Sequence, residues 1–109
     1  MKRIALLLLF TAACAKHASH EQAVAACDHE IELGYWKGFD ESIAKAGHDP
    51  KDPDIHAMGV QALPDKKKSD EWKSARDSCA TGMENATPEQ LTCVTAATTV
   101  DAAMACLTK

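Results

Sequence analysis

The stretch Ser19–Ala46 reads SHEQAVAACDHEIELGYWKGFDESIAKA and predicts one long amphipathic helix over about residues 20–46. Ser19 is suited to cap the helix N-terminus, and Gln22 stands three residues later, as a capping box requires. Apolar residues then recur every three or four positions, which is the spacing of one helix face, and Gly47 marks the end. This apolar face is expected to comprise Val24, Cys27, Ile31, Tyr35, Phe39 and Ile43.

Two glycines, Gly34 and Gly38, interrupt this helix. Each should weaken the helix by about 1 kcal/mol relative to alanine. Two interpretations remain open at this point: the helix bends there, or another helix packs closely on that face.

Residues 48–65 contain three prolines, so little regular structure is expected there. One short helix over residues 54–63 is the exception, with Ile55, Met58 and Ala62 turned inward. We expect loop for the rest of this region.

The next long helix is predicted to begin at Ser69, because the acids that follow suit the positive end of a helix dipole. It should run to about residue 85. Its inward face is expected to comprise Trp72, Ala75, Cys79 and Met83, at spacings of three and four residues.

The C-terminal region has two helix starts. Thr87 is followed by Pro88 at the first helical position and by Gln90, which completes a second capping box. Thr98-Thr99 offers a further start, and we prefer a break there to one helix over residues 89–107 because β-branched residues lower helix propensity. The inward residues are expected to be Leu91, Val94, Val100, Met104 and Leu107.

These patterns predict an all-α fold, a small bundle of three to four helices in a single domain over residues 19–109. The large apolar residues are few, and alanine supplies much of the hydrophobic count. A small domain with so thin a core usually needs cross-links.

The five cysteines are Cys14, Cys27, Cys79, Cys93 and Cys106. The last four are expected to form two disulfides if the chain is exported, and three pairings are possible. The helices on either side of residues 82–87 would form an antiparallel hairpin, with Cys79 and Cys93 at similar heights. We therefore predict the pairs Cys79–Cys93 and Cys27–Cys106.

The chain begins MKRIALLLLFTAAC, which has the three parts of a secretory signal: a positive start, an apolar run and a small-residue end. The apolar run, residues 4–10, is far short of the roughly 20 residues that a membrane-spanning helix needs. We therefore expect residues 1–13 to be a cleaved signal peptide.

The last five residues of this leader, Phe10 to Cys14, resemble the lipobox of bacterial lipoproteins. Thr11 departs from the Leu that this family most often has. The resemblance implies that Cys14 receives a diacylglyceryl group and becomes the new N-terminus, with residues 14–18 as a tether. Ala15 after the cysteine implies the outer membrane, facing the periplasm. The alternative is an ordinary secretory signal cut near Ala13 or Ala15, with Cys14 incidental.

The net charge and the absence of common catalytic motifs argue against two classes of function, nucleic-acid binding and enzymatic catalysis. Removal of residues 1–13 takes away Lys2 and Arg3 and leaves ten basic against sixteen acidic residues, a net charge of −6. Nucleic-acid binding normally demands a basic surface, so we expect no nucleic-acid partner. The chain lacks the common nucleophile and phosphate-loop motifs, so we expect no catalytic residues, no cofactor and no enzymatic activity.

The expected function is a membrane-anchored, non-enzymatic structural or protein-interaction module. Its expected partners are the bilayer, through acylated Cys14, and another envelope protein. The alternative is a periplasmic metal- or small-ligand-binding lipoprotein, with His17, His20 and His29 as candidate ligands. Solvated surface histidines explain the same residues, so no metal site is assigned. Lys66–Lys68 could contact lipid headgroups, but a solvated face explains them better.

Overall fold

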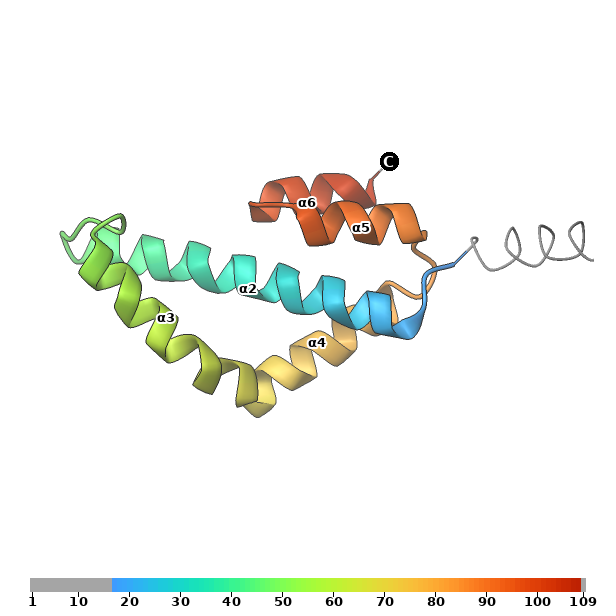
Figure 1. Ribbon diagram of the computed structural model, residues 1–109, viewed down its shortest axis with the longest axis horizontal. Coiled ribbons are helices and arrows are strands. Elements are labelled where there is room, and N and C mark those ends of the chain that lie inside the picture. Colours follow the sequence, from blue (N-terminus) through green and yellow to red (C-terminus); the bar gives the residue numbers. More distant parts are fainter. Residues whose placement is uncertain (1–16, 109) are drawn as a thin grey trace, which may run out of the picture.

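The computed structural model describes residues 17–108, which form five α-helices and no β-strand (Figure 1). The all-α prediction is confirmed, with one helix more than the three to four expected. The leader, Cys14 and most of the predicted tether lie outside the described residues. The helices are α2 (His20–Lys45), α3 (Pro53–Lys68), α4 (Asp70–Gly82), α5 (Pro88–Ala96) and α6 (Val100–Leu107).

The long helix α2 is the element on which the others pack. Helix α4 lies along one side of it and the α5–α6 pair lies along another, while α3 descends from its far end to meet α4 (Figure 1). The capping box predicted for α2 is confirmed: Ser19 Oγ accepts from Gln22 N, and Gln22 Oε1 accepts from Ser19 N, both at 3.1 Å.

Helix α3 is longer than the short helix expected over residues 54–63. Asp52 caps it by accepting a hydrogen bond from Asp54 N at 2.9 Å, and Pro53 occupies the first helical position. The helix then continues through the exposed Pro64 to Lys68. The Asp52-Pro53 pair is a standard helix start, so the sequence did carry a signal for this N-terminus.

A single residue, Ser69, joins α3 to α4. Its hydroxyl donates to Lys66 O at the end of α3 (2.6 Å) and accepts from Trp72 N at the start of α4 (3.2 Å). The predicted start at Ser69 is therefore confirmed. One side chain closes both helices, so the chain turns sharply there with no intervening loop.

The predicted break near the C-terminus is also confirmed. Helix α5 has the expected capping box between Thr87 and Gln90 and ends at Ala96. Thr99 caps α6 by accepting from Ala102 N at 3.1 Å. The two helices pack on each other and on α2.

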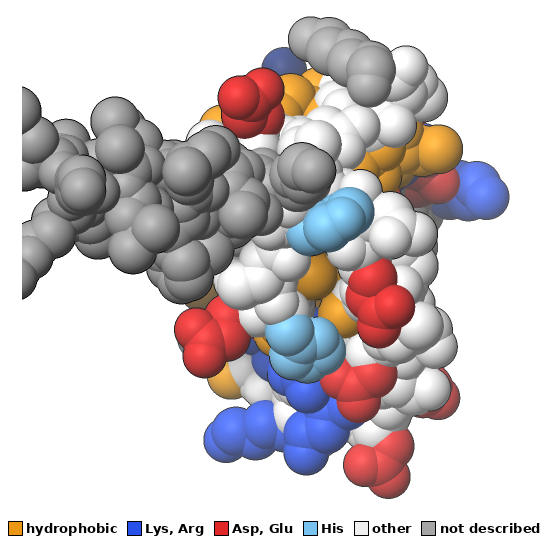
Figure 2. Space-filling view, turned by 90° about the vertical axis from the view of Figure 1, so that its right-hand side faces the viewer, with side chains coloured by type: hydrophobic (Ala, Val, Ile, Leu, Met, Phe, Trp, Pro, Cys, Tyr) orange, Lys and Arg blue, Asp and Glu red, His pale blue; other side chains and the backbone are white. Residues whose placement is uncertain are grey.

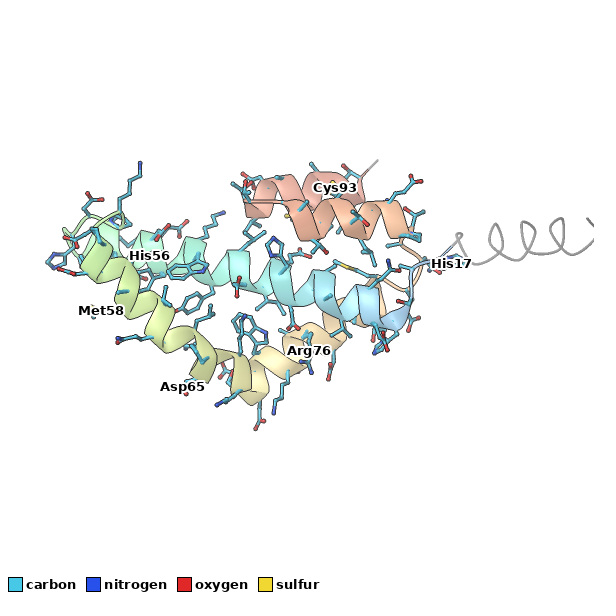
Figure 3. The ribbon with its side chains drawn as sticks, in the orientation of Figure 1. His17, His56, Met58, Asp65, Arg76 and Cys93 are labelled. Atoms are coloured by element: carbon cyan, nitrogen blue, oxygen red, sulfur yellow. A yellow bond between two sulfur atoms is a disulfide. The ribbon has the colours of Figure 1, made fainter. Side chains whose placement is uncertain are left out.

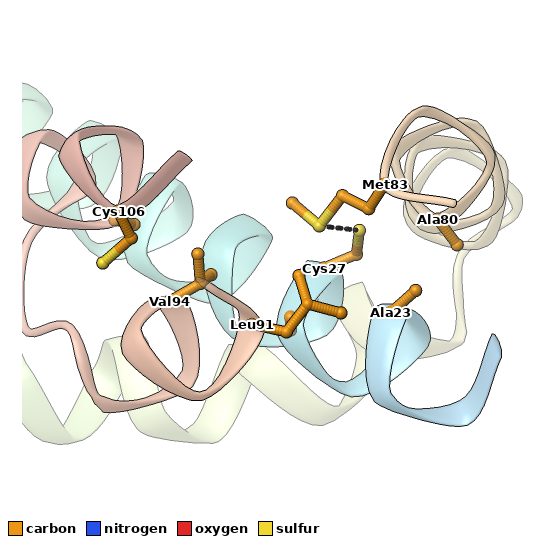
Figure 4. Close-up of a cluster of buried hydrophobic side chains, with 9 residues drawn as sticks. Ala23, Cys27, Ala80, Met83, Leu91, Val94 and Cys106 are labelled. Atoms are coloured by element: carbon orange, nitrogen blue, oxygen red, sulfur yellow. Dashed lines mark hydrogen bonds between the residues drawn. The ribbon is translucent and has the colours of Figure 1, made fainter. Parts of the chain in front are cut away.

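The core is small and lies where α2, α4, α5 and α6 meet (Figure 4). Leu91 and Val94 are buried as predicted, and they are among its few large side chains. The core is thus as thin as the composition suggested. Its buried members are Ala23, Ala26, Cys27, Ala80, Met83, Leu91, Val94, Ala103 and Cys106.

Four residues expected to face inward are exposed: Met58, Ala62, Ala75 and Met104. In α6 the inward residues are Ala103 and Cys106 instead. The disulfide of Cys106 sets this rotation, because a residue two positions earlier points to the opposite side of a helix. In α3 the buried residue is Gly59.

The predicted disulfide pairs are wrong. The structure joins Cys27 to Cys79 and Cys93 to Cys106, so the same four cysteines pair differently. The error lies in the hairpin assumption: α4 and α5 each pack on α2, whereas the antiparallel partner of α5 is α6. Cys79 therefore faces α2, and Cys93 faces α6.

The two disulfides close loops of different length. Their sequence separations are 52 and 13 residues. In the chain-entropy account these loops correspond to about 4 and about 3 kcal/mol of stabilisation. The Cys27–Cys79 bond, which fixes α4 on α2, is therefore the larger contribution.

Two further contacts hold α4 on α2. Trp72, buried near the start of α4, donates its indole N–H to Asp28 Oδ1 at 3.1 Å. Met83, just beyond the end of α4, places Sδ 3.6 Å from Cys27 Sγ, a van der Waals contact because the disulfide sulfur carries no proton (Figure 4).

Double digestion with trypsin and a glutamate-specific protease under non-reducing conditions should report the connectivity. We expect residues 22–30 to be linked to residues 77–84, and residues 90–109 to carry an internal disulfide. Mass spectrometry distinguishes the outcomes, since either other pairing would join all three fragments in one species. Recovery of that three-fragment species would contradict the structure.

Candidate functional site

The C-terminal half of α2 and the helix α3 form a separate unit, here called the aromatic arm. It carries Tyr35, Trp36 and Phe39 from α2 and His56 from α3. None of these residues belongs to the buried core. The arm therefore has its own packing, at the end of α2 farthest from the start of the described chain (Figure 1).

Trp36 is the centre of the arm. Its indole stacks on the His56 imidazole, with ring centroids 4.6 Å apart and planes inclined by 18°. Tyr35 and Phe39 meet the indole edge to face, at 5.2 and 5.6 Å. Such geometries are favourable for aromatic pairs, so the arm has a defined arrangement despite its exposure.

Gly59 is what allows α3 to approach these rings. A Cβ atom at this position would lie 2.6 Å from Trp36 Cζ3, closer than packed carbon atoms come, and 3.1 Å from Phe39 Cζ, which is a tight contact. The Tyr35 hydroxyl also donates to Gly59 O at 2.7 Å. The backbone of α3 thus rests directly on the aromatic side chains of α2.

Gly59 was not predicted from the sequence, in which Gly34 and Gly38 are the glycines that interrupt a predicted long helix. A Cβ atom at either of those positions would meet nothing within 4 Å. The interpretation that another helix packs closely on them is therefore wrong. Gly59 differs from Gly34 and Gly38 only in that aromatic side chains lie opposite it. The sequence does not reveal which of the three glycines faces those side chains.

A shallow pocket of about 590 Å³, here called the tip pocket, opens beside Trp36. It lies where α2 ends and the loop to α3 begins. Asp49 in this loop accepts a hydrogen bond from the backbone N–H of Lys51 at 2.9 Å, which orders the loop. The lining residues are Trp36, Asp40, Asp49, Pro50, Lys51 and His56.

The candidate metal ligands predicted from the sequence are not brought together. His17 and His20 are exposed, whereas His29 is half-buried and its Nε2 lies 2.6 Å from Ala97 O, so this nitrogen donates a hydrogen bond. Figure 3 places His17 and His56 at opposite ends of the molecule. Within residues 17–108, no three His, Cys, Asp or Glu side chains are grouped as a metal site.

The run Lys66–Lys68 lies at the C-terminal end of α3, where cations favour the helix dipole. Lys67 also makes an ion pair with Glu32 of α2 at 2.6 Å. Figure 2 shows blue and red side chains interspersed on the end face of the molecule rather than separated into large patches. A local structural role therefore explains these lysines.

Models of known protein families, curated proteins and solved structures were compared with the chain, and none of them matches it. In the part of the chain from residue 17 to residue 108, no helix is both long and apolar enough to cross a membrane. Function is therefore inferred from the chain's own residues.

Replacing Gly59 with alanine should loosen the arm, because the added methyl group meets Trp36 and Phe39. We expect the unfolding free energy, measured by urea denaturation, to fall by about 1–3 kcal/mol. Relative to the unsubstituted protein, hydrogen exchange should become faster in α3, with a smaller change in α5. Gly34→Ala is the matched control and should stabilise by up to about 1 kcal/mol. Equal effects of the two substitutions would refute the proposed close approach.

Proposed function

We propose that this chain is an exported protein, anchored to the cell envelope by a lipid on Cys14, and that its helical domain is a non-enzymatic protein-interaction module. The observation that carries the proposal is the use of the cysteines. Four of the five are paired in two disulfides, and Cys14 is the one left over. That remaining cysteine stands directly after the leader, at the position where a lipobox is modified.

The disulfides support export for a separate physical reason. Disulfides persist in oxidising compartments and are rare in the cytosol. The core of this domain is built largely from alanine, so the cross-links supply stability that hydrophobic burial does not. A chain kept in a reducing compartment would form neither disulfide. The domain would therefore reach its full stability only after export.

The geometry of the domain also suits a membrane anchor. Ala18 N donates to Ala86 O at 3.0 Å, which holds the chain's entry point against the α4–α5 loop. Only three residues lie between Cys14 and Ala18, and the four residue steps that join them reach at most about 14 Å. The domain would therefore sit close to the bilayer at the end where α2 begins.

The aromatic arm would then project from the anchored end. Helix α2 has 26 residues and is about 39 Å long, and the arm lies along its distal half (Figure 1). An interaction module benefits from this layout, because the short tether fixes one end while the other end remains available to a partner. The tip pocket at that far end is the surface that we assign to the interaction.

Intact mass of the protein purified from membranes tests this proposal. We expect loss of residues 1–13, addition of diacylglyceryl and acyl groups at Cys14, and loss of four hydrogens to two disulfides. The Cys14→Ser variant should carry no added lipid mass while its disulfides still form. An unmodified Cys14 in a mature protein cut elsewhere would overturn the anchor, as would a chain that retains its leader in the cytosol.

A further inference from the structure

The geometry points to an arginine side chain as the group that the tip pocket binds, and we infer that the pocket receives a basic segment of a partner protein. This inference rests on the proposed interaction function and specifies its site and the chemistry of the partner. Four features favour a cation there: two aspartates, an indole ring and a helix C-terminus at the pocket, together with the net charge of the chain without its leader.

Asp40 and Asp49 line the pocket from two different elements, the last turns of α2 and the loop that follows. Both residues are exposed, and within residues 17–108 neither makes an ion pair. The Asp49 carboxylate accepts only the Lys51 N–H among the hydrogen bonds of the described residues, and the backbone carbonyl of Asp49 accepts from Asp52 N. Both carboxylates therefore have free acceptor capacity, and a planar guanidinium can use two acceptors at once.

Trp36 supplies the second feature. Tryptophan is the best aromatic partner for a cation, and arginine is the cation that most often makes this contact because its planar group also stacks. The indole is only half-buried, and its stacking on His56 and its contact with Gly59 fix its orientation. A pre-oriented ring costs little side-chain entropy when a ligand binds.

The electrostatic surroundings agree with this assignment. The pocket adjoins the C-terminal end of α2, and the C-terminus of a helix carries a partial negative charge. The chain without its leader has a net charge of −6, which attracts basic partners over longer distances. Two features oppose this attraction: the N-terminal end of α3, which carries a partial positive charge, and Lys51, whose side chain is exposed and free to turn toward solvent.

The chain also contains an internal reference for the experiment. The two indole N–H groups, of Trp36 and Trp72, give separate NMR signals in isotope-labelled protein. Trp72 is buried and donates to Asp28, away from the tip pocket. A ligand in the pocket should therefore move the Trp36 signal and leave the Trp72 signal in place.

The test is a titration of the full processed protein in detergent micelles with the peptide acetyl-Gly-Arg-Arg-Gly-amide. The matched control peptide carries citrulline in place of arginine, which keeps the shape and removes the charge. We expect a saturable shift of the Trp36 indole signal with the arginine peptide, weaker at high salt, and no saturation with the citrulline peptide.

Substitutions then locate the binding site. Asp40→Asn and Asp49→Asn should each weaken binding about threefold, and roughly tenfold together, as expected for partly exposed charge pairs. Asn at position 49 can still accept the Lys51 N–H, so the loop should keep its shape. Asp65→Asn makes the same charge change on the exposed surface of α3 and should leave the affinity unchanged (Figure 3).

Three results would overturn the inference: no saturable shift of the Trp36 signal, equal binding of the citrulline peptide, or unchanged affinity in the Asp40→Asn/Asp49→Asn double variant. Saturable binding of a neutral oligosaccharide in place of the arginine peptide would also count against it. Binding is measured on solubilised protein, so the outcome does not depend on the lipid at Cys14. Failure here and failure of the membrane anchor are thus distinguishable.

Discussion

The covalent bond between Cys27 and Cys79 is the constraint on which the rest of the arrangement depends. It fixes α4 against the N-terminal half of α2, with the Trp72–Asp28 hydrogen bond acting nearer the start of α4. The position of α3 then follows, because its two ends are tied to α2 by a short loop and to α4 by Ser69. The aromatic arm is thus held by its own ring contacts and also, through Ser69 and α4, by the part of the domain that the disulfide fixes.

The two halves of α2 pack in different ways. In its N-terminal half, Ala23, Ala26 and Cys27 present little bulk, so neighbouring helices come close and the interior is filled by small side chains. In its C-terminal half, Tyr35, Trp36 and Phe39 hold α3 through ring contacts and leave a pocket open beside them. Stability is concentrated in the first half, and the surface assigned to binding lies in the second.

Local features of the fold could be predicted from the sequence because they depend on residues only a few positions apart. The capping boxes at Ser19 and Thr87 and the start at Ser69 are of this kind. The disulfide pairing could not be predicted from the sequence, because it depends on which helix lies opposite each cysteine. The sequence was compatible with an α4–α5 hairpin, and only the packing of both helices on α2 excludes it.

The candidate site was beyond sequence reasoning for a similar reason. Trp36 comes from α2, Asp49 from a loop and His56 from α3, and no motif links them. Gly59 shows the limit most clearly, because it is distinguished from Gly34 only by the rings that oppose it. The periodicity of α3 was also misjudged, since Met58 was expected inside and is 63% exposed.

Thermal unfolding with and without a reducing agent tests the central claim most directly. If the disulfides supply what the core lacks, their combined contribution of about 7 kcal/mol is comparable with the whole stability of a small domain. Far-UV circular dichroism should then show a cooperative transition for the oxidised protein. After reduction, Tm should fall by more than about 20 °C or the transition should disappear. A reduced protein that keeps its helicity and unfolds cooperatively at nearly the same Tm would contradict the account.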